Sequence, residues 1–150
     1  QRKNKVMKKF WWLLSSCILV VACEVKPQEI AYGSDGCHFC KMTIVDTKHA
    51  AQLVTEKGKS FKYDAIECML NHLNEWDQAA VKYYLVTDYA NPKVLIDALN
   101  ANYLVSEATP SPMGANLSAF ENPIIREQMI QKRGGDILSW EQLQQGFIKR

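Results

Sequence analysis

The 150-residue chain lacks the motifs that mark several common classes of enzyme. It contains no glycine-rich phosphate-binding loop, no nucleophile elbow and no arrangement of paired carboxylates. Apolar residues make up 47% and charged residues 23%, the composition of an ordinary globular protein and not of a disordered or membrane-spanning one. Because no catalytic constellation stands out, we expect a binding protein and not an enzyme.

The apolar run near the N-terminus is too short to cross a membrane. It covers residues 10–22 (FWWLLSSCILVVA), which is 13 residues, whereas a transmembrane helix needs about 20. Five basic residues and no acidic one lie in residues 1–22. A basic segment followed by a short apolar run is typical of a secretory signal, so we predict a signal peptide over residues 1–22.

A cysteine, Cys23, directly follows the residues LVVA at the end of this run. The pattern resembles a bacterial lipobox, in which the cysteine is lipidated and becomes the mature N-terminus. The alternative is an ordinary signal peptide cut near Ala22. Acyl chains anchor a protein to a membrane without spanning it. We therefore expect a lipoprotein that faces the periplasm or the outer surface of a bacterial cell, with residues 23–36 as its tether.

The predicted mature chain also lacks an excess of positive charge. The full sequence has 18 basic and 16 acidic residues, a net charge of +2. Residues 1–22 hold five of the basic residues and none of the acidic ones, so the remainder has 13 basic and 16 acidic residues and a net charge of −3. The charge balance gives no reason to expect nucleic-acid binding.

A complete set of four cysteines is missing from the predicted mature chain. Cys17 leaves with the signal peptide and Cys23 is the predicted lipid site, so Cys37, Cys40 and Cys68 remain. An odd number of cysteines in an oxidising compartment means that at least one is free, bound to a metal or paired outside the chain. A four-thiolate zinc or iron–sulfur site is excluded.

The segment CHFCKM, residues 37–42, holds the most informative group of side chains. Cys40 and Met42 are two residues apart, so on an extended segment both would project to the same face. A thiolate beside a thioether is a poor zinc site and a good Cu(I) site. Met42 could instead be a core residue that opens a strand, and His38 could be a third ligand or a solvated loop residue.

Two other interpretations of the cysteines remain open. Cys68 and His72 are four residues apart on a predicted helix and, with Cys37 and Cys40, could form a structural zinc site. In the alternative without a metal, Cys68 packs in the core and His72 is exposed. Cys37 and Cys40 could also form a thiol–disulfide pair. A reactive thiol of such a pair usually lies at a helix N-terminus, which lowers its pKa, whereas the residues MTIVD (42–46) that follow predict a strand.

The element pattern predicts an α+β fold of two similar ββαβ halves, residues 37–89 and 90–150. A short match between LVTE (53–56) and LVSE (104–107) supports the duplication. The first half is expected to have strands in 42–46 and 49–64, turning at Lys57-Gly58, a helix capped by Asp64, and a strand over 81–89. The second half has two strands around a Pro/Gly-containing loop in 102–122, a helix from the Asn122 cap to Gly134-Gly135, a short strand or turn at 136–140 and a last helix over 139–149.

These residues together resemble the NosL family, accessory proteins of nitrous oxide reductase. The resemblance rests on the lipobox cysteine, CHFCKM, AQLVTEKGKSFKYDAIECML (51–70) and SPMGANLSAF (111–120), and it covers about residues 31–140. It implies a membrane-tethered Cu(I) metallochaperone that supplies copper to the reductase or to its membrane maturation complex. It also implies a fold of two ββαβ halves, related to that of organomercury lyase.

The resemblance implies roles for particular residues. Cys40 and Met42 match the Cys-x-Met of the family, and Met113 matches the methionine of SPMG. Cys37 fits the variants with two cysteines, and Cys68 is assigned nothing. Delivery requires a site that binds copper and also releases it to a partner. We therefore expect a partly accessible Cu(I) ion held by Cys40, Met42 and one or two of Cys37, His38 and Met113.

Overall fold

The structure of the chain, a computed structural model, describes residues 24–76 and 80–147. The predicted signal peptide (residues 1–22) and the predicted lipid site Cys23 lie outside these residues. Among the helices of the described segments, none has the length and apolar character that crossing a bilayer requires.

The first half forms a four-stranded antiparallel sheet in the order β2-β1-β3-β4. The chain reverses between the first two strands at Gly58, which takes the left-handed conformation (φ +82°) that the predicted turn requires. One helix, α2, follows β2. The elements are β1 (Ala51–Thr55), β2 (Ser60–Tyr63), α2 (Ile66–Glu75), β3 (Val81–Thr87) and β4 (Leu95–Asp97).

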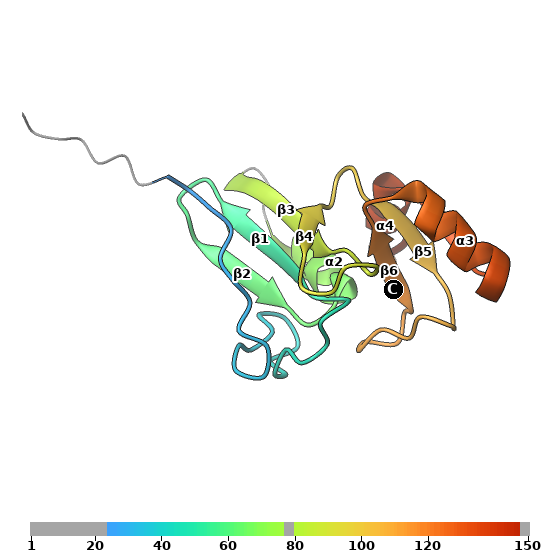
Figure 1. Cartoon of the computed structure of the whole chain (residues 1–150). Coiled ribbons are helices and arrows are strands. Elements are labelled where there is room, and N and C mark those ends of the chain that lie inside the picture. The colour runs from blue at the N-terminus through green and yellow to red at the C-terminus, as the bar shows by residue number, and fades with distance from the viewer. Residues whose placement is uncertain (1–23, 77–79, 148–150) are drawn as a thin grey trace, which may run out of the picture.

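The second half forms a three-stranded antiparallel sheet in the order β6-β5-β7. Figure 1 shows this sheet beside the first one, with α3 on its outer side. The elements are β5 (Asn102–Val105), β6 (Leu117–Phe120), α3 (Pro123–Arg133), β7 (Asp136–Leu138) and α4 (Trp140–Phe147).

The two halves share one topology. In each half the first strand is central and pairs antiparallel both with the second strand and with the strand that follows the helix. The prediction of an α+β fold with two similar ββαβ halves is therefore confirmed. The strand β4 was not predicted. It pairs with β3, so the first sheet continues past residue 89.

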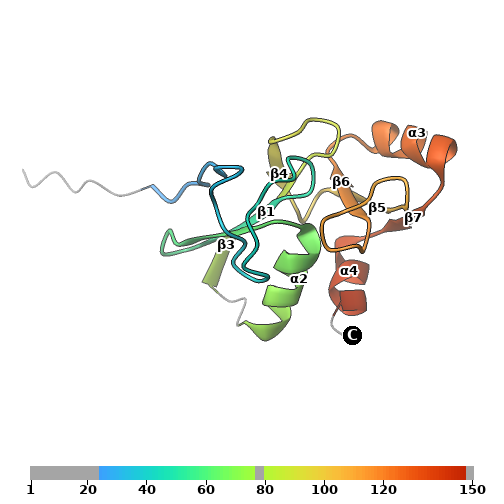
Figure 2. The ribbon, with the colours of Figure 1, turned by 90° about the horizontal axis from the view of Figure 1, so that it is seen from below.

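One hydrophobic core runs through both halves. α2 buries Met69, Leu70 and Leu73, whose spacing of three and four residues places them on one face. α4 adds Trp140 and Leu143 to the same core, and Figure 2 shows the two helices side by side. Burying one such side chain contributes about 1.5–3 kcal/mol. This packing fixes the position of α2, which carries part of the candidate site.

The helix ends match the predicted caps in α3 but not in α2. The Asn122 side chain accepts a hydrogen bond from the backbone N–H of Ile124 (2.9 Å), and Gly134 ends α3 at φ +72°. The prediction that Asp64 caps α2 is wrong, because the N-cap is Ala65 and makes no side-chain capping bond. The Asp64 carboxylate instead accepts a long hydrogen bond from the backbone of the loop that precedes β1 (3.4 Å).

Candidate metal centre

The segment Cys37–Met42 is a tight loop and not the start of a strand. The Cys37 N–H donates to the Met42 carbonyl (2.7 Å), and the Lys41 N–H donates to the Cys37 carbonyl (3.1 Å). Lys41 takes a left-handed conformation (φ +66°), which reverses the chain. Of the strand predicted over 42–46, only Thr43 pairs, in a single bridge with Gly36. That prediction is wrong, because the reversal leaves no extended run that a sheet could take up.

Three cysteines meet between this loop and α2. The Sγ atoms of Cys37, Cys40 and Cys68 all lie within 4.8 Å of one another. In the described parts of the chain they are the one group of three or more Cys, His, Asp or Glu side chains placed to share a metal ion. Metal–sulfur bonds of about 2.3 Å place the ligand sulfurs of one ion roughly 3.8 Å apart, so a small closure would suffice.

The three thiols differ in exposure. Cys68, in the first turn of α2, is 0% exposed and Cys37 is 2% exposed. Cys40, at the far side of the loop, is half-buried. The cluster is therefore closed on the side of the core and reachable on the side of Cys40.

Hydrogen bonds within the cluster give the three thiols different pKa values. The Cys68 thiol donates to Cys37 and lowers the Cys37 pKa below its ordinary value, with backbone hydrogen bonds at Asp64 and Cys40 helping against the effect of burial. The same bond to Cys37 raises the Cys68 pKa, and burial adds to that shift. Burial also raises the pKa of Cys40. The cluster thus holds one stabilised thiolate, at Cys37, which is the ionisation state that binds a metal.

The two methionines predicted as ligands are exposed. Met42 is 61% exposed at the end of the cysteine loop, and Met113 is 41% exposed in the loop between β5 and β6. The Ser111 hydroxyl ties this second loop to α2 by donating to Glu67, the neighbour of Cys68. Figure 1 shows both loops on the lower side of the molecule, each below its own sheet. Whether either thioether binds copper stays a prediction.

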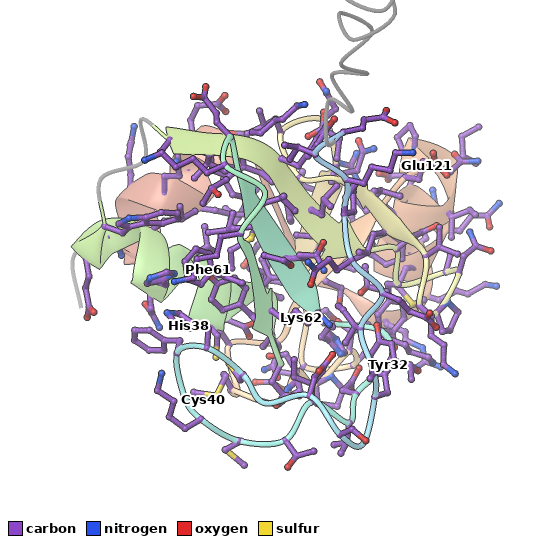
Figure 3. All side chains as sticks on the ribbon, turned by 90° about the vertical axis from the view of Figure 1, so that its left-hand side faces the viewer. Tyr32, His38, Cys40, Phe61, Lys62 and Glu121 are labelled. Carbon is purple, nitrogen blue, oxygen red and sulfur yellow. The ribbon has the colours of Figure 1, made fainter. Side chains whose placement is uncertain are left out.

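A pair of histidines lies beside the thiols. The His38 ring packs against Phe61, with centroids 4.6 Å apart, and faces the His72 ring at 4.7 Å. Figure 3 shows His38 between Phe61 and Cys40. Nδ1 of His72 lies 2.5 Å from the Tyr63 hydroxyl. Of the four ligands considered for zinc, the structure gathers the three cysteines, while His72 hydrogen-bonds to Tyr63.

Cys68 is the residue that the family resemblance left unassigned. The sequence offered one signal for it, since Cys68 is a cysteine in the first turn of a predicted amphipathic helix and so could face inward. What spacing could not indicate is that this turn packs behind the loop 37–42, some 30 residues earlier in the chain. Cys68 therefore joins Cys37 and Cys40 as a candidate ligand.

Comparisons with known proteins agree with this fold. The family model of NosL matches residues 28–148. The crystal structure of the copper chaperone NosL from Shewanella denitrificans has a similar fold, with a TM-score of 0.70 and 22% sequence identity. The match covers 82% of this chain and 98% of that one. A search of curated proteins finds no match.

Proposed function

The chain belongs to the NosL family, and from this premise we propose that it is a Cu(I) metallochaperone for the maturation of nitrous oxide reductase. It is a carrier and not an enzyme, and acylated Cys23 anchors it to the periplasmic or outer face of a bacterial membrane. The observation that carries the proposal is the cluster of three cysteine sulfurs within 4.8 Å of one another. The similar fold of a protein described as a copper chaperone supports it.

The donor set favours Cu(I) over zinc. Thiolates are soft ligands that suit Cu(I), whereas structural zinc sites are almost always four-coordinate. No fourth Cys, His, Asp or Glu joins the three sulfurs in the part of the chain that the structure describes. Cys37 supplies a thiolate at once, and metal binding at Cys40 and Cys68 would displace their protons.

The same arrangement supports release as well as binding. Cys37 and Cys68 are buried, so Cys40 is the sulfur that an incoming ligand can reach first. An incoming ligand of the partner can bond to copper there before the Cu–S bonds to Cys37 and Cys68 break. Met42 in the cysteine loop and Met113 in the loop between β5 and β6 offer exposed thioethers that can hold copper weakly during the exchange. Copper stays Cu(I) throughout, and the thiols take up protons again as it leaves.

The proposal is tested by metal competition. The whole protein, reduced and anaerobic, is titrated with Cu(I) and Zn(II) against a chelator of known affinity. We expect preferential binding of Cu(I). Cys40→Ala and Cys68→Ala should each weaken Cu(I) binding by at least about ten-fold, because even the loss of a group that only supports a ligand costs about 10–100-fold.

Met69→Leu is the matched control. Met69 is buried beside Cys68 in α2 but lies outside the cluster, and its replacement conserves volume. Its Cu(I) affinity should equal that of the unmodified protein. Preferential zinc uptake that survives Cys40→Ala would overturn the proposal. Reversible turnover of a Cys37–Cys40 disulfide in a dithiol assay would favour the redox alternative.

The link to the reductase needs a separate experiment. Nitrous oxide reductase is purified from cells that carry the unmodified protein or the Cys40→Ala/Cys68→Ala double variant, and its copper is measured. We expect less copper in the enzyme from the variant strain. Equal copper contents would show that this protein does not supply the reductase.

A further inference from the structure

The cysteine loop and α2 each carry a cysteine followed by a histidine. His38 comes directly after Cys37, and His72 lies one helical turn after Cys68. The thiols of Cys37 and Cys68 are buried, whereas both imidazoles are only half-buried, and their rings lie 4.7 Å apart. The two segments thus form an inner layer of sulfur and an outer layer of nitrogen.

Both imidazoles keep ring nitrogens that could bind a metal. Among the hydrogen bonds of the described segments, none uses a ring nitrogen of His38 or Nε2 of His72. Both ring nitrogens of His38 and Nε2 of His72 are therefore not used in hydrogen bonds between the residues that the structure describes.

Aromatic side chains hold the two rings in place. Trp76 stacks on His72, with centroids 5.2 Å apart and an interplanar angle of 11°. Phe61 contacts both imidazoles, at 4.6 Å and 5.4 Å. The Tyr63 hydroxyl, 2.5 Å from Nδ1 of His72, can accept a hydrogen bond from Nδ1–H, and in that tautomer Nε2 of His72 is free to be the ligand atom. Such partners of a ligating histidine typically set its orientation and basicity.

We propose that His38 and His72 form a second copper site, in which the two imidazoles hold Cu(I) on its way between the buried thiols and the partner. The inference rests on the proposed function, because copper is the cargo. In the transfer the Cu–S bonds break as two Cu–N bonds form, the sulfurs of Cys40 and Cys68 take up protons again, and the oxidation state of copper does not change. Imidazole is a suitable ligand for copper but a harder one than thiolate, so this site is the weaker of the two.

The surrounding charges also keep the second site weak. Lys41 and Lys59 lie close enough to disfavour positive charge on both imidazoles. They act on a bound Cu(I) ion in the same way. A weak outer site beside a strong inner one lets copper leave the thiols without first entering water.

The experiment is an anaerobic titration of the whole reduced protein with Cu(I), followed by chelator competition and tryptophan fluorescence. We expect two Cu(I) ions to bind, the second at least about ten-fold more weakly. Its binding should quench the fluorescence of Trp76, which stacks on His72. Trp76→Phe identifies this residue as the reporter.

Two variants test the ligands directly. His38→Gln/His72→Gln should keep the first copper and lose both the second copper and the quenching. Tyr63→Phe keeps both imidazoles and should weaken only the second site, by about 10–100-fold. This milder variant carries the test if the double variant does not fold, as judged by circular dichroism of the metal-free protein.

The inference fails if the unmodified protein binds a single copper, or if the second copper and the quenching persist in the histidine double variant. Neither result affects the first, cysteine-dependent copper. Conversely, loss of the first copper in Cys40→Ala together with a retained second one separates the two sites. A protein that binds no Cu(I) with either set of ligands overturns the proposed function as well.

Discussion

Single residues at the candidate site show how burial and hydrogen bonding set chemical roles. Cys37, Cys40 and Cys68 are the same residue type, yet only Cys37 is held as a thiolate, because the Cys68 thiol donates to it. Cys40 differs in being reachable from solvent. Cys37 therefore supplies the negative charge, Cys68 closes the inner side of the cluster, and Cys40 is the sulfur that a partner can reach.

Glu67, next to Cys68, is a buried carboxyl group, and burial disfavours its charged form. It is 2% exposed, Ser111 donates to its Oε1, and its Oε2 has no hydrogen-bond partner within the described segments. Burial is the main cause that raises the Glu67 pKa above its ordinary value of 4.5. The folded protein therefore holds this proton more tightly than the unfolded chain does.

The stability of the metal-free protein should reflect this shift. The favourable contribution of protonated Glu67 is full below about pH 4.5 and is lost as the pH rises through the raised folded-state pKa. Glu67→Gln keeps the acceptor for Ser111 and does not titrate. We expect the melting temperature of the variant, relative to the unmodified protein, to increase from about pH 4 to about pH 7.

The control for this prediction is Glu75→Gln. Glu75 is an exposed carboxyl at the end of the same helix, so this variant reports the effect of removing a carboxyl that is not buried. A difference for Glu67→Gln that is constant over the whole pH range would contradict the assignment.

At the scale of elements, the second half depends on backbone geometry at the end of α3. No residue of α3 is buried, so its caps rather than core packing define where it begins and ends. Gly134 ends the helix, and Gly135 then brings the chain against β5 before β7 begins. Gly135 has φ +132°, and a Cβ atom there would lie 2.6 Å from the Val105 carbonyl oxygen.

Gly135→Ala should therefore disrupt the pairing of β7 with β5. Overpacking against backbone costs about 1–3 kcal/mol and adds to the strain of a left-handed alanine, so we expect the free energy of unfolding to fall by about 3 kcal/mol. Urea denaturation measures this loss. Gly134→Ala is the matched control, because φ is also positive (+72°) but nothing lies within 4 Å of its Cβ. Equal losses in the two variants would argue against the steric explanation.

At the scale of the whole molecule, contacts between the halves hold the site together. The Tyr89 N–H donates to the Ala119 carbonyl (2.8 Å), which joins the end of the first sheet to β6. Buried His49 has one ring nitrogen 3.0 Å from Asp46 and the other 3.3 Å from Ser118 of β6. The loop that holds Met113 is fixed to α2 through Ser111. The second half thus contributes a methionine-bearing loop that is tied to α2, the helix that carries Cys68.

The predicted tether places this assembly at a membrane. If Cys23 is acylated, Cys23→Ser should remove the anchor, since each buried CH₂ group of an acyl chain contributes about 0.8 kcal/mol of membrane affinity. We expect the variant in the soluble fraction after cell lysis and the unmodified protein in the membrane fraction, as measured by immunoblotting. Cys17→Ser is the control and should stay in the membrane fraction. A Cys23→Ser protein that remains membrane-bound would refute lipidation at this residue.

The sequence by itself determined the order of the helices and strands from residue 51 onward except β4, the duplication, the caps of α3 and the importance of the segment 37–42, because each leaves a local record in spacing and residue type. Only the tertiary structure decided that this segment is a closed loop, that Cys68 completes a group of three thiols, and that His38 faces His72. Local periodicity indicates which face of a helix is apolar. It carries no information on which distant loop covers that face, since packing against β2 and the core settles that contact.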